Sequence, residues 1–279
     1  MIHHSSFKGK VKCGLPLVLT IGLYALFYYC FFAGFYQKAD IGSVDQALVV
    51  IWNLFAALGA VSLVYCVALD PGCVPDDFCL ENIPSENTQS LSDDMREIDH
   101  CLGKVTYCSK CGTYRPSRAH HCSYCERCIL RYDHHCPYVA NCVGLRNHKA
   151  FILFLGYSGI SLAVMGAQVL SFALQEDTSD WKVLVAGIGG IGLFFTLFGF
   201  ACFHLWLVVR NCTSLELNWR DFNIYDLGNY QNFTQIFGKS KLYWLLPGPS
   251  NQIEGLLFPV KIRNKTGGGY TVVENKYLI

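Results

Sequence analysis

The sequence predicts an α-helical integral membrane protein with four transmembrane helices and a cytosolic cysteine-rich module between the second and third helices. Three observations support this prediction: an apolar composition, four long uncharged segments, and the positions of the basic residues. Of the 279 residues, 52% are hydrophobic and only 15% are charged. A soluble domain of this length normally carries more charge, so the composition favours a membrane protein.

Four segments are long enough to cross a bilayer, which takes about 20 mostly apolar residues in a helix. They are residues 15–36, 47–69, 151–174 and 183–209, and none contains Lys, Arg, Asp or Glu. The first segment follows Lys8, Lys10 and Lys12, so a cleaved signal peptide is the alternative interpretation. Its apolar length exceeds a usual signal core and a second apolar segment follows closely, so we favour a transmembrane helix.

The basic residues predict the orientation, because Lys and Arg are retained on the cytosolic side during insertion. Of the 22 Lys and Arg, 3 precede the first helix, 9 lie between the second and third helices, and 8 follow the fourth. The two short outer loops hold one each, Lys38 and Lys182. We therefore expect a cytosolic N-terminus (1–14), a cytosolic module (70–149) and a cytosolic C-terminal region (210–279).

The module is rich in metal-binding side chains. Cys-x-x-Cys pairs with nearby histidines in the reducing cytosol indicate zinc, because thiolate and imidazole are its preferred ligands. Two tetrahedral ions would use eight of the available groups and leave three unassigned. The seven cysteines and four histidines between residues 107 and 147 are Cys108, Cys111, Cys122, Cys125, Cys128, Cys136, Cys142, His120, His121, His134 and His135.

Spacing alone does not settle which ligands share an ion. It makes Cys108 and Cys111 one half-site and Cys122 and Cys125 another. The groups available to complete the two sites are Cys128, Cys142 and two of the histidines.

The run Asp133-His134-His135-Cys136 combines a carboxylate, two imidazoles and a thiol. A thiol becomes a strong nucleophile when an imidazole takes its proton, and a carboxylate can fix the tautomer of that imidazole. If the run is extended, His134 and Cys136 share one face and His135 points to the other. On spacing alone, Cys136 is either a nucleophile or a further zinc ligand in a structural finger.

These motifs resemble those of the DHHC protein S-acyltransferases, or palmitoyltransferases. The matching elements are Cys108-x-x-Cys111, Arg115-Pro116-x-Arg118-x-x-His121-Cys122-x-x-Cys125-x-x-Cys128, Asp133-His134-His135-Cys136-Pro137, Asn141-Cys142-Val143-Gly144, and Asn147 followed by Phe151. Outside the module, Asp70-Pro71-Gly72, Thr213-Ser214-Leu215-Glu216 and residues 225–232 are similar to further family elements. The resemblance spans nearly the whole chain.

The resemblance implies two structural zinc ions and a two-step transfer reaction. Cys136 would attack a long-chain acyl-CoA, typically palmitoyl-CoA, and form a thioester, with His134 as general base and Asp133 orienting it. The acyl group would then pass to cysteine thiols of proteins at the cytosolic membrane face. The implied zinc ligands are Cys108, Cys111, His121 and Cys128 for one ion, and Cys122, Cys125, His135 and Cys142 for the other.

Two positions depart from the family pattern. Tyr138 stands where the family usually has Trp, and Ser214 stands where the Thr-Thr-x-Glu element has its second Thr, after Thr213. Both positions keep the kind of group expected for substrate binding, an aromatic ring and a hydroxyl. The resemblance also places Ser161 at the position that limits the depth of the acyl chain, where a small residue would tolerate longer chains.

Other function classes fit the sequence less well. The rival to an enzyme is a non-catalytic, zinc-containing membrane scaffold, and the intact Asp133, His134 and Cys136 argue against it. A nucleic-acid partner is not expected, because the net charge is only +1 and no finger with a recognition helix is present. The expected partners are membrane lipids, palmitoyl-CoA and proteins with cytosolic cysteines, and the expected location is an endomembrane, the Golgi ahead of the endoplasmic reticulum or plasma membrane.

Overall fold

The computed structural model describes residues 7–37, 43–75, 78, 106–176, 179–218, 223–248, 255–256, 258–263 and 270–273. Four apolar helical segments confirm the predicted fold class: Gly14–Tyr36, Gln46–Ala68, His148–Gln175 and Trp181–Val209. Lys38, which contributes to the predicted orientation, lies outside the described residues.

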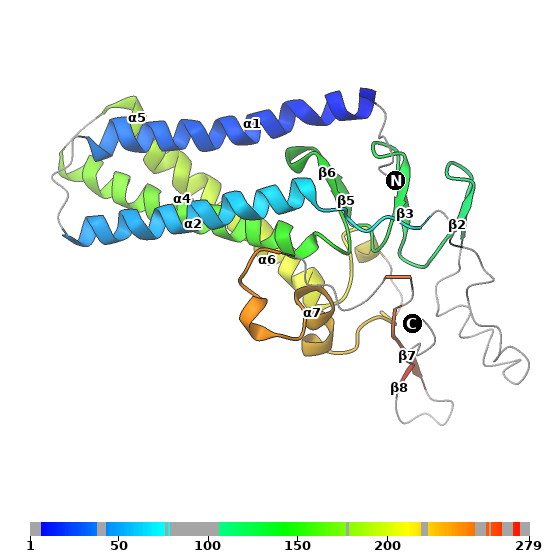
Figure 1. Ribbon diagram of the computed structural model, residues 1–279. Coiled ribbons are helices and arrows are strands. Elements are labelled where there is room, and N and C mark those ends of the chain that lie inside the picture. The colour runs from blue at the N-terminus through cyan, green and yellow to red at the C-terminus, as the bar shows by residue number, and fades with distance from the viewer. Residues whose placement is uncertain are drawn as a thin grey trace, which may run out of the picture.

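The helices run side by side and the cysteine-rich module lies at one end of the bundle (Figure 1). α4 is the central helix, because 67% of its apolar window is buried against 17–22% for the others. It packs on α2 at one side and on α6 at the other. The helical elements are α1 Phe7–Phe31 continued by η1 Phe32–Tyr36, α2 Ser43–Ala68, α4 His148–Gln175, and α5 Trp181–Leu184, η4 Val185–Gly189 and α6 Gly190–Val209 in succession.

Glycines allow α4 to approach the fourth span closely. A Cβ on Gly166 would lie 3.1 Å from the Gly187 carbonyl oxygen, and one on Gly190 would lie 3.0 Å from the side chain of Met165. Small residues at such contacts are typical of membrane helices, where packing replaces the hydrophobic effect between helices. Gly187 and Gly190 thus face α4, whereas Gly192 and Gly199 face open space.

The module consists of three short antiparallel hairpins, β1 Thr106–Cys108 with β2 Thr113–Arg115, β3 His120–Cys122 with β4 Arg127–Ile129, and β5 His134–Cys136 with β6 Asn141–Val143. Each strand has three residues. An isolated two-stranded hairpin is marginally stable in water, so these hairpins need additional cross-links.

Side-chain amides fasten the module to the end of α2. The last carbonyls of a helix have no partner within it. Asn141 Nδ2 donates to the carbonyl oxygens of Cys66 and Leu69, both at 2.9 Å. Gly144 fits against Pro71 beside this joint, because a Cβ there would lie 2.6 Å from the Pro71 carbonyl oxygen. The β5–β6 hairpin is therefore held at the C-terminal end of α2.

The segment after α6 folds back against the module. It contains η5 Glu216–Asn218, α7 Asn229–Phe237, η6 Lys241–Tyr243, and the strand pair β7 Val260–Arg263 and β8 Tyr270–Val273. Phe258 and Val260 are buried in one cluster with Leu130 and Leu145 of the module. The link is reinforced by the buried Arg118, which forms an ion pair with Glu216 at 2.8 Å.

Candidate active site and metal clusters

The structure brings together the first of the two implied ligand sets, hereafter the first cluster: Cys108, Cys111, His121 and Cys128. All four ligand atoms lie within 4.8 Å of one another. The Cys111 Sγ is 3.2 Å from His121 Nδ1 and 3.7 Å from Cys128 Sγ. The Cys108 Sγ is 3.6 Å from the same imidazole nitrogen.

The second cluster has the same composition: Cys122, Cys125, His135 and Cys142. Cys122, Cys125 and Cys142 place their sulfurs 3.6, 3.5 and 3.5 Å from His135 Nδ1. Cys125 and Cys142 have their sulfurs 3.4 Å apart. The two clusters therefore match in both donor type and spacing.

Strand register explains the partition of ligands between the clusters. His121 lies directly opposite Cys128 in the β3–β4 hairpin, and both belong to the first cluster. Because successive strand residues point to opposite faces, the adjacent Cys122 faces the second cluster instead. In the β5–β6 hairpin His135 lies opposite Cys142, and both belong to the second cluster. The β3–β4 hairpin thus contributes ligands to both clusters.

The donor geometry of each cluster fits one tetrahedral metal ion. A zinc ion with sulfur ligands at about 2.3 Å and a nitrogen at about 2.0 Å would hold its ligand atoms roughly 3.5–3.8 Å apart. The seven separations given above run from 3.2 to 3.7 Å, and all ligand atoms of each cluster lie within 4.8 Å of one another. Four protein ligands close such a site and leave no open coordination position.

Alternate residues of β5 face different sites, so His135 faces the second cluster whereas His134 and Cys136 do not. The strand covers His134 to Cys136, so these three residues are extended, and the two neighbours of His135 face the other side. His134 Nδ1 lies 2.7 Å from Asp133 Oδ2. Cys136 belongs to neither cluster and is buried beside residues of α2 and α4, including Leu63 and Phe154.

The Asp133–His134 pair has the electrostatics of an activated base. Burial by itself raises the pKa of the Asp133 carboxyl, but hydrogen bonds from His134 and the Ser214 backbone hold that pKa well below its ordinary value. Burial lowers the pKa of His134, whereas its interactions with Asp133 and Cys136 outweigh burial and raise the pKa to about 9. The imidazole is therefore a stronger proton acceptor than an ordinary histidine.

Ser214, 81 residues further along the chain, donates two hydrogen bonds to the Asp133 carboxylate. Its backbone N–H donates to Asp133 Oδ1 at 2.9 Å, and its hydroxyl donates to Oδ2 at 3.1 Å. The Thr213–Glu216 turn is in turn held by Glu216 Oε2, which accepts from the Thr213 N–H at 2.9 Å. Because Glu216 also binds Arg118 of the module, this turn and the Asp-His pair form one connected unit.

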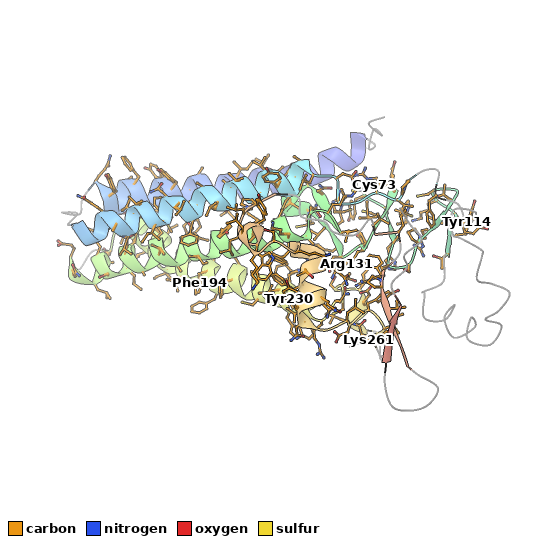
Figure 2. All side chains as sticks on the ribbon, turned by 60° about the horizontal axis from the view of Figure 1, so that its bottom comes forward. Cys73, Tyr114, Arg131, Phe194, Tyr230 and Lys261 are labelled. Atoms are coloured by element: carbon orange, nitrogen blue, oxygen red, sulfur yellow. The ribbon has the colours of Figure 1, made fainter. Side chains whose placement is uncertain are left out.

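A buried chain of polar groups leads from Arg131 toward the same pair. Arg131 Nη1 lies 2.9 Å from His148 Nδ1, and His148 Nε2 lies 3.1 Å from His204 Nδ1. Burial lowers the pKa of Arg131 only to about 10, so the guanidinium remains a charged donor at neutral pH. His148 must then accept at Nδ1 and donate from Nε2 to His204. Figure 2 shows Arg131 at the junction of helices and module.

His204 lies beside the reacting groups. Its ligand atom is within 4.8 Å of those of Asp133 and His134, and its ring centroid is 5.8 Å from that of His134. Arg131, His148 and His204 are far apart in the chain, so no spacing rule brings them together.

The remaining site residues lie at different distances from the thiol. Tyr138 follows Cys136 in η3 Pro137–Val139, and its ring is 60% exposed. Its carbonyl oxygen accepts from the hydroxyl of Thr20 of α1 at 3.2 Å. Ser161 is buried thirteen residues along α4 from its first residue and donates to the Trp52 carbonyl oxygen at 3.5 Å. It is therefore well inside the bundle and does not contact the Asp-His-Cys group.

The fold and the site together define a class: multi-pass membrane proteins that carry two Cys/His metal clusters beside a buried Asp-His-Cys group. Comparison with known proteins narrows that class. Residues 103–220 match the family model described as DHHC palmitoyltransferase. The chain is 35% identical over 257 residues to "Probable protein S-acyltransferase 13" of Arabidopsis thaliana, with 84% of each chain covered.

Animal relatives match a shorter stretch. "Palmitoyltransferase ZDHHC20-B" of Danio rerio is 40% identical over 174 residues, which cover 57% of this chain and 54% of the relative. "Palmitoyltransferase ZDHHC2" of Mus musculus is 38% identical over 180 residues, 58% of this chain and 48% of the relative. The chain belongs to the DHHC palmitoyltransferase family.

Proposed function

We propose that this family member is a protein S-acyltransferase that moves a long-chain acyl group, typically palmitoyl, from acyl-CoA to cysteine thiols through a thioester on Cys136. The observation that carries the proposal is the hydrogen-bonded Asp133–His134 pair next to a thiol that belongs to neither metal cluster. A purely structural finger has no need for a buried carboxylate that orients a non-ligand histidine. The same observation disfavours the non-catalytic scaffold.

The tautomer of His134 follows from its partner. Asp133 is ionised and can only accept, so His134 Nδ1 carries the proton that it donates. Nε2 is then the nitrogen that takes the proton of the Cys136 thiol, and the raised pKa of about 9 keeps that proton on His134 at neutral pH until the leaving group needs it. The thiolate attacks the acyl-CoA carbonyl, the bond to the CoA sulfur breaks, and the CoA thiol leaves with the proton from His134.

The second half of the reaction repeats these roles. A substrate cysteine gives its proton to His134 and attacks the acyl-Cys136 thioester, and Cys136 leaves as the thiol. A thioester is broken and a thioester is formed in each half, so orientation and activation of the thiol are the main tasks of the protein.

We propose zinc as the ion of both clusters, because sets of three thiolates and one imidazole suit it. When bound, the ions supply folding free energy and fix the hairpins. The ligands are the eight residues of the first and second clusters. None of the eight takes part in acyl transfer.

The surroundings of Cys136 favour entry of the acyl chain into the bundle. The thiol lies in an apolar cluster with side chains of α2 and α4. We propose that the acyl chain extends along these helices toward Ser161, with Tyr138 near the mouth and Thr213 and Ser214 supporting Asp133. We also propose that the module and both termini are cytosolic, that the substrates are proteins with cytosolic cysteines, and that the Golgi is the favoured membrane.

Purified full-length protein incubated with labelled palmitoyl-CoA tests the proposal. We expect a hydroxylamine-labile label on the wild type and none on Cys136→Ser, with two zinc ions per chain in both. Wild-type protein that holds two zinc ions but acquires no label would support the scaffold and refute the acyltransferase. Loss of zinc from Cys136→Ser would instead make Cys136 a ligand.

A further inference from the structure

The chain turns back along the bundle immediately after α7. We call residues 239–246 the post-α7 segment; it contains η6 Lys241–Tyr243. In Figure 1 it is the orange stretch beside the helices near the module end. Four of its side chains are apolar yet face outward: Leu242, Tyr243, Leu245 and Leu246 are 75%, 57%, 70% and 47% exposed.

This exposure contrasts with the next apolar stretch of the chain. Phe258 and Val260 are only 3% and 1% exposed, because they pack in the core cluster between module and helices. Four large apolar side chains that project outward within five residues are unusual for a surface in water. Their environment is set by where the segment lies relative to the bilayer.

Two hydrogen bonds to α4 fix the depth of the post-α7 segment relative to the bilayer. Lys149 Nζ donates to the Tyr243 carbonyl oxygen at 2.6 Å, and the Tyr157 hydroxyl donates to the Leu245 carbonyl oxygen. Both donors belong to α4, whose 28 residues are apolar enough to cross a membrane. At 1.5 Å per residue α4 is about 42 Å long, comparable with a bilayer including its headgroups, and Tyr157 lies about 12 Å further along it than Lys149.

Because each headgroup layer is only about 6 Å thick, the segment descends from the headgroup level into the outer part of the hydrocarbon. Lys239 and Lys241 are exposed at its start, where lipid phosphates would meet them. Tyr243 and Trp244 follow, and these residue types are enriched at membrane–water interfaces. Apart from Leu242, which precedes the aromatic pair, the order of charged, aromatic and aliphatic residues matches the order of layers in a bilayer leaflet.

Backbone hydrogen bonds of the post-α7 segment also suit an apolar environment, where an unpaired N–H or carbonyl group costs several kcal/mol. The N–H groups of Tyr243, Trp244 and Leu246 donate within the segment at 3.2 Å. The Trp244 indole N–H donates to the Gly238 carbonyl oxygen at 2.9 Å. With the carbonyls of Tyr243 and Leu245 capped from α4, the outward face consists mainly of hydrocarbon.

We infer that the post-α7 segment is inserted in the bilayer leaflet on the module's side, with Leu242 and Tyr243 at the lipid interface and Leu245 and Leu246 among lipid acyl chains. The occupant of this face is lipid rather than a second protein, because the two hydrogen bonds to α4 place the segment alongside a helix that is apolar and long enough to cross the bilayer, at the depth of one leaflet. The C-terminal region is thus attached to the membrane independently of the four spans.

Site-specific photo-crosslinking in phospholipid nanodiscs tests this inference on the full chain. Leu242→p-benzoylphenylalanine and Leu245→p-benzoylphenylalanine are compared with two controls of similar exposure. Phe195 of α6, 68% exposed, is the lipid-facing control, and Tyr107 of the module, 57% exposed, is the water-facing control. All four positions are exposed, so each variant should keep its packing, which zinc content and a single elution peak verify.

After irradiation, mass spectrometry measures phospholipid adducts. We expect positions 242 and 245 to form adducts at a yield comparable with position 195 and several-fold above position 107. Yields at 242 and 245 no higher than at 107 would overturn the inference. Crosslinks from these positions to a second copy of the chain would overturn it as well, because the face would then be a protein interface.

Discussion

The two metal clusters are alike in composition but differ in what surrounds them. Each combines three thiols with one imidazole, and each draws on two neighbouring hairpins. The first cluster is completed by the β1–β2 hairpin, where Tyr107 and Tyr114 are 57% and 40% exposed. Figure 2 shows Tyr114 at the end of the module away from the helices.

The second cluster shares a strand with the residues proposed to carry out acyl transfer. It takes His135 from the middle of β5, whose two other residues are His134 and Cys136. Its thiols pack with Ile129 and Tyr132 inside the module. The difference indicates a division of labour: an ion in the first cluster stabilises the outer hairpins, and one in the second fixes the strand that presents the thiol.

The strongest test of this comparison is His135→Ala. We expect loss of the second ion together with collapse of β5 and no acyl-enzyme, because structural zinc contributes on the order of 10 kcal/mol to folding of small domains. Zinc per chain and thermal unfolding of the module measure the effect. Retention of both ions with normal stability would remove His135 from the ligand set.

Cys111→Ala addresses the first cluster and should have a smaller effect. We expect loss of one ion and several kcal/mol of module stability, on the scale of a broken structural metal site. Acyl-enzyme formation should be reduced but measurable, because the second cluster and β5 keep their ligands. If labelling disappears as fully as in His135→Ala, the two clusters do not differ in function.

Asp133→Asn separates catalysis from metal binding. The variant should keep two zinc ions and fold, whereas the rate of acyl-enzyme formation should fall by about 10²–10⁴, the usual contribution of an oriented acid–base group. Rapid-quench labelling with palmitoyl-CoA gives the rate. An unchanged rate would show that His134 needs no carboxylate partner.

Ser214→Ala should produce the smallest change. It removes the hydroxyl bond to Asp133 and leaves the backbone N–H bond in place, which costs about 1 kcal/mol, or roughly five- to tenfold in rate. Ser214→Thr, which keeps the hydroxyl, is the matched control and should label like the wild type. Equal rates for all three proteins would mean that the hydroxyl does not orient Asp133.

The sequence predicts the parts of this molecule that depend on local pattern. Apolar length identifies the four spans, and Cys-x-x-Cys spacing identifies both half-sites. Spacing could not assign His121 and His135 to their clusters, because that depends on the strand register that places each opposite a cysteine. The resemblance supplied the assignment, and the register gives its physical reason.

Other features depend on contacts across the fold. The Arg131–His148–His204 chain joins a loop and two spans, and its members are too far apart in the sequence for any spacing to connect them. Tyr24 of α1 is hydrogen-bonded to Ser158, one turn of α4 before the expected Ser161. The post-α7 segment is too short for a hydropathy window, and only its bonds to α4 reveal its depth.

The shared β3–β4 hairpin has a consequence for how the protein matures in the cell. Because one hairpin supplies ligands to both clusters, occupation of either one orders part of the other before its ion arrives. Thermodynamic linkage then requires the ions to raise each other's affinity. At limiting zinc a population of this protein should divide into fully loaded and empty chains, with few half-loaded ones.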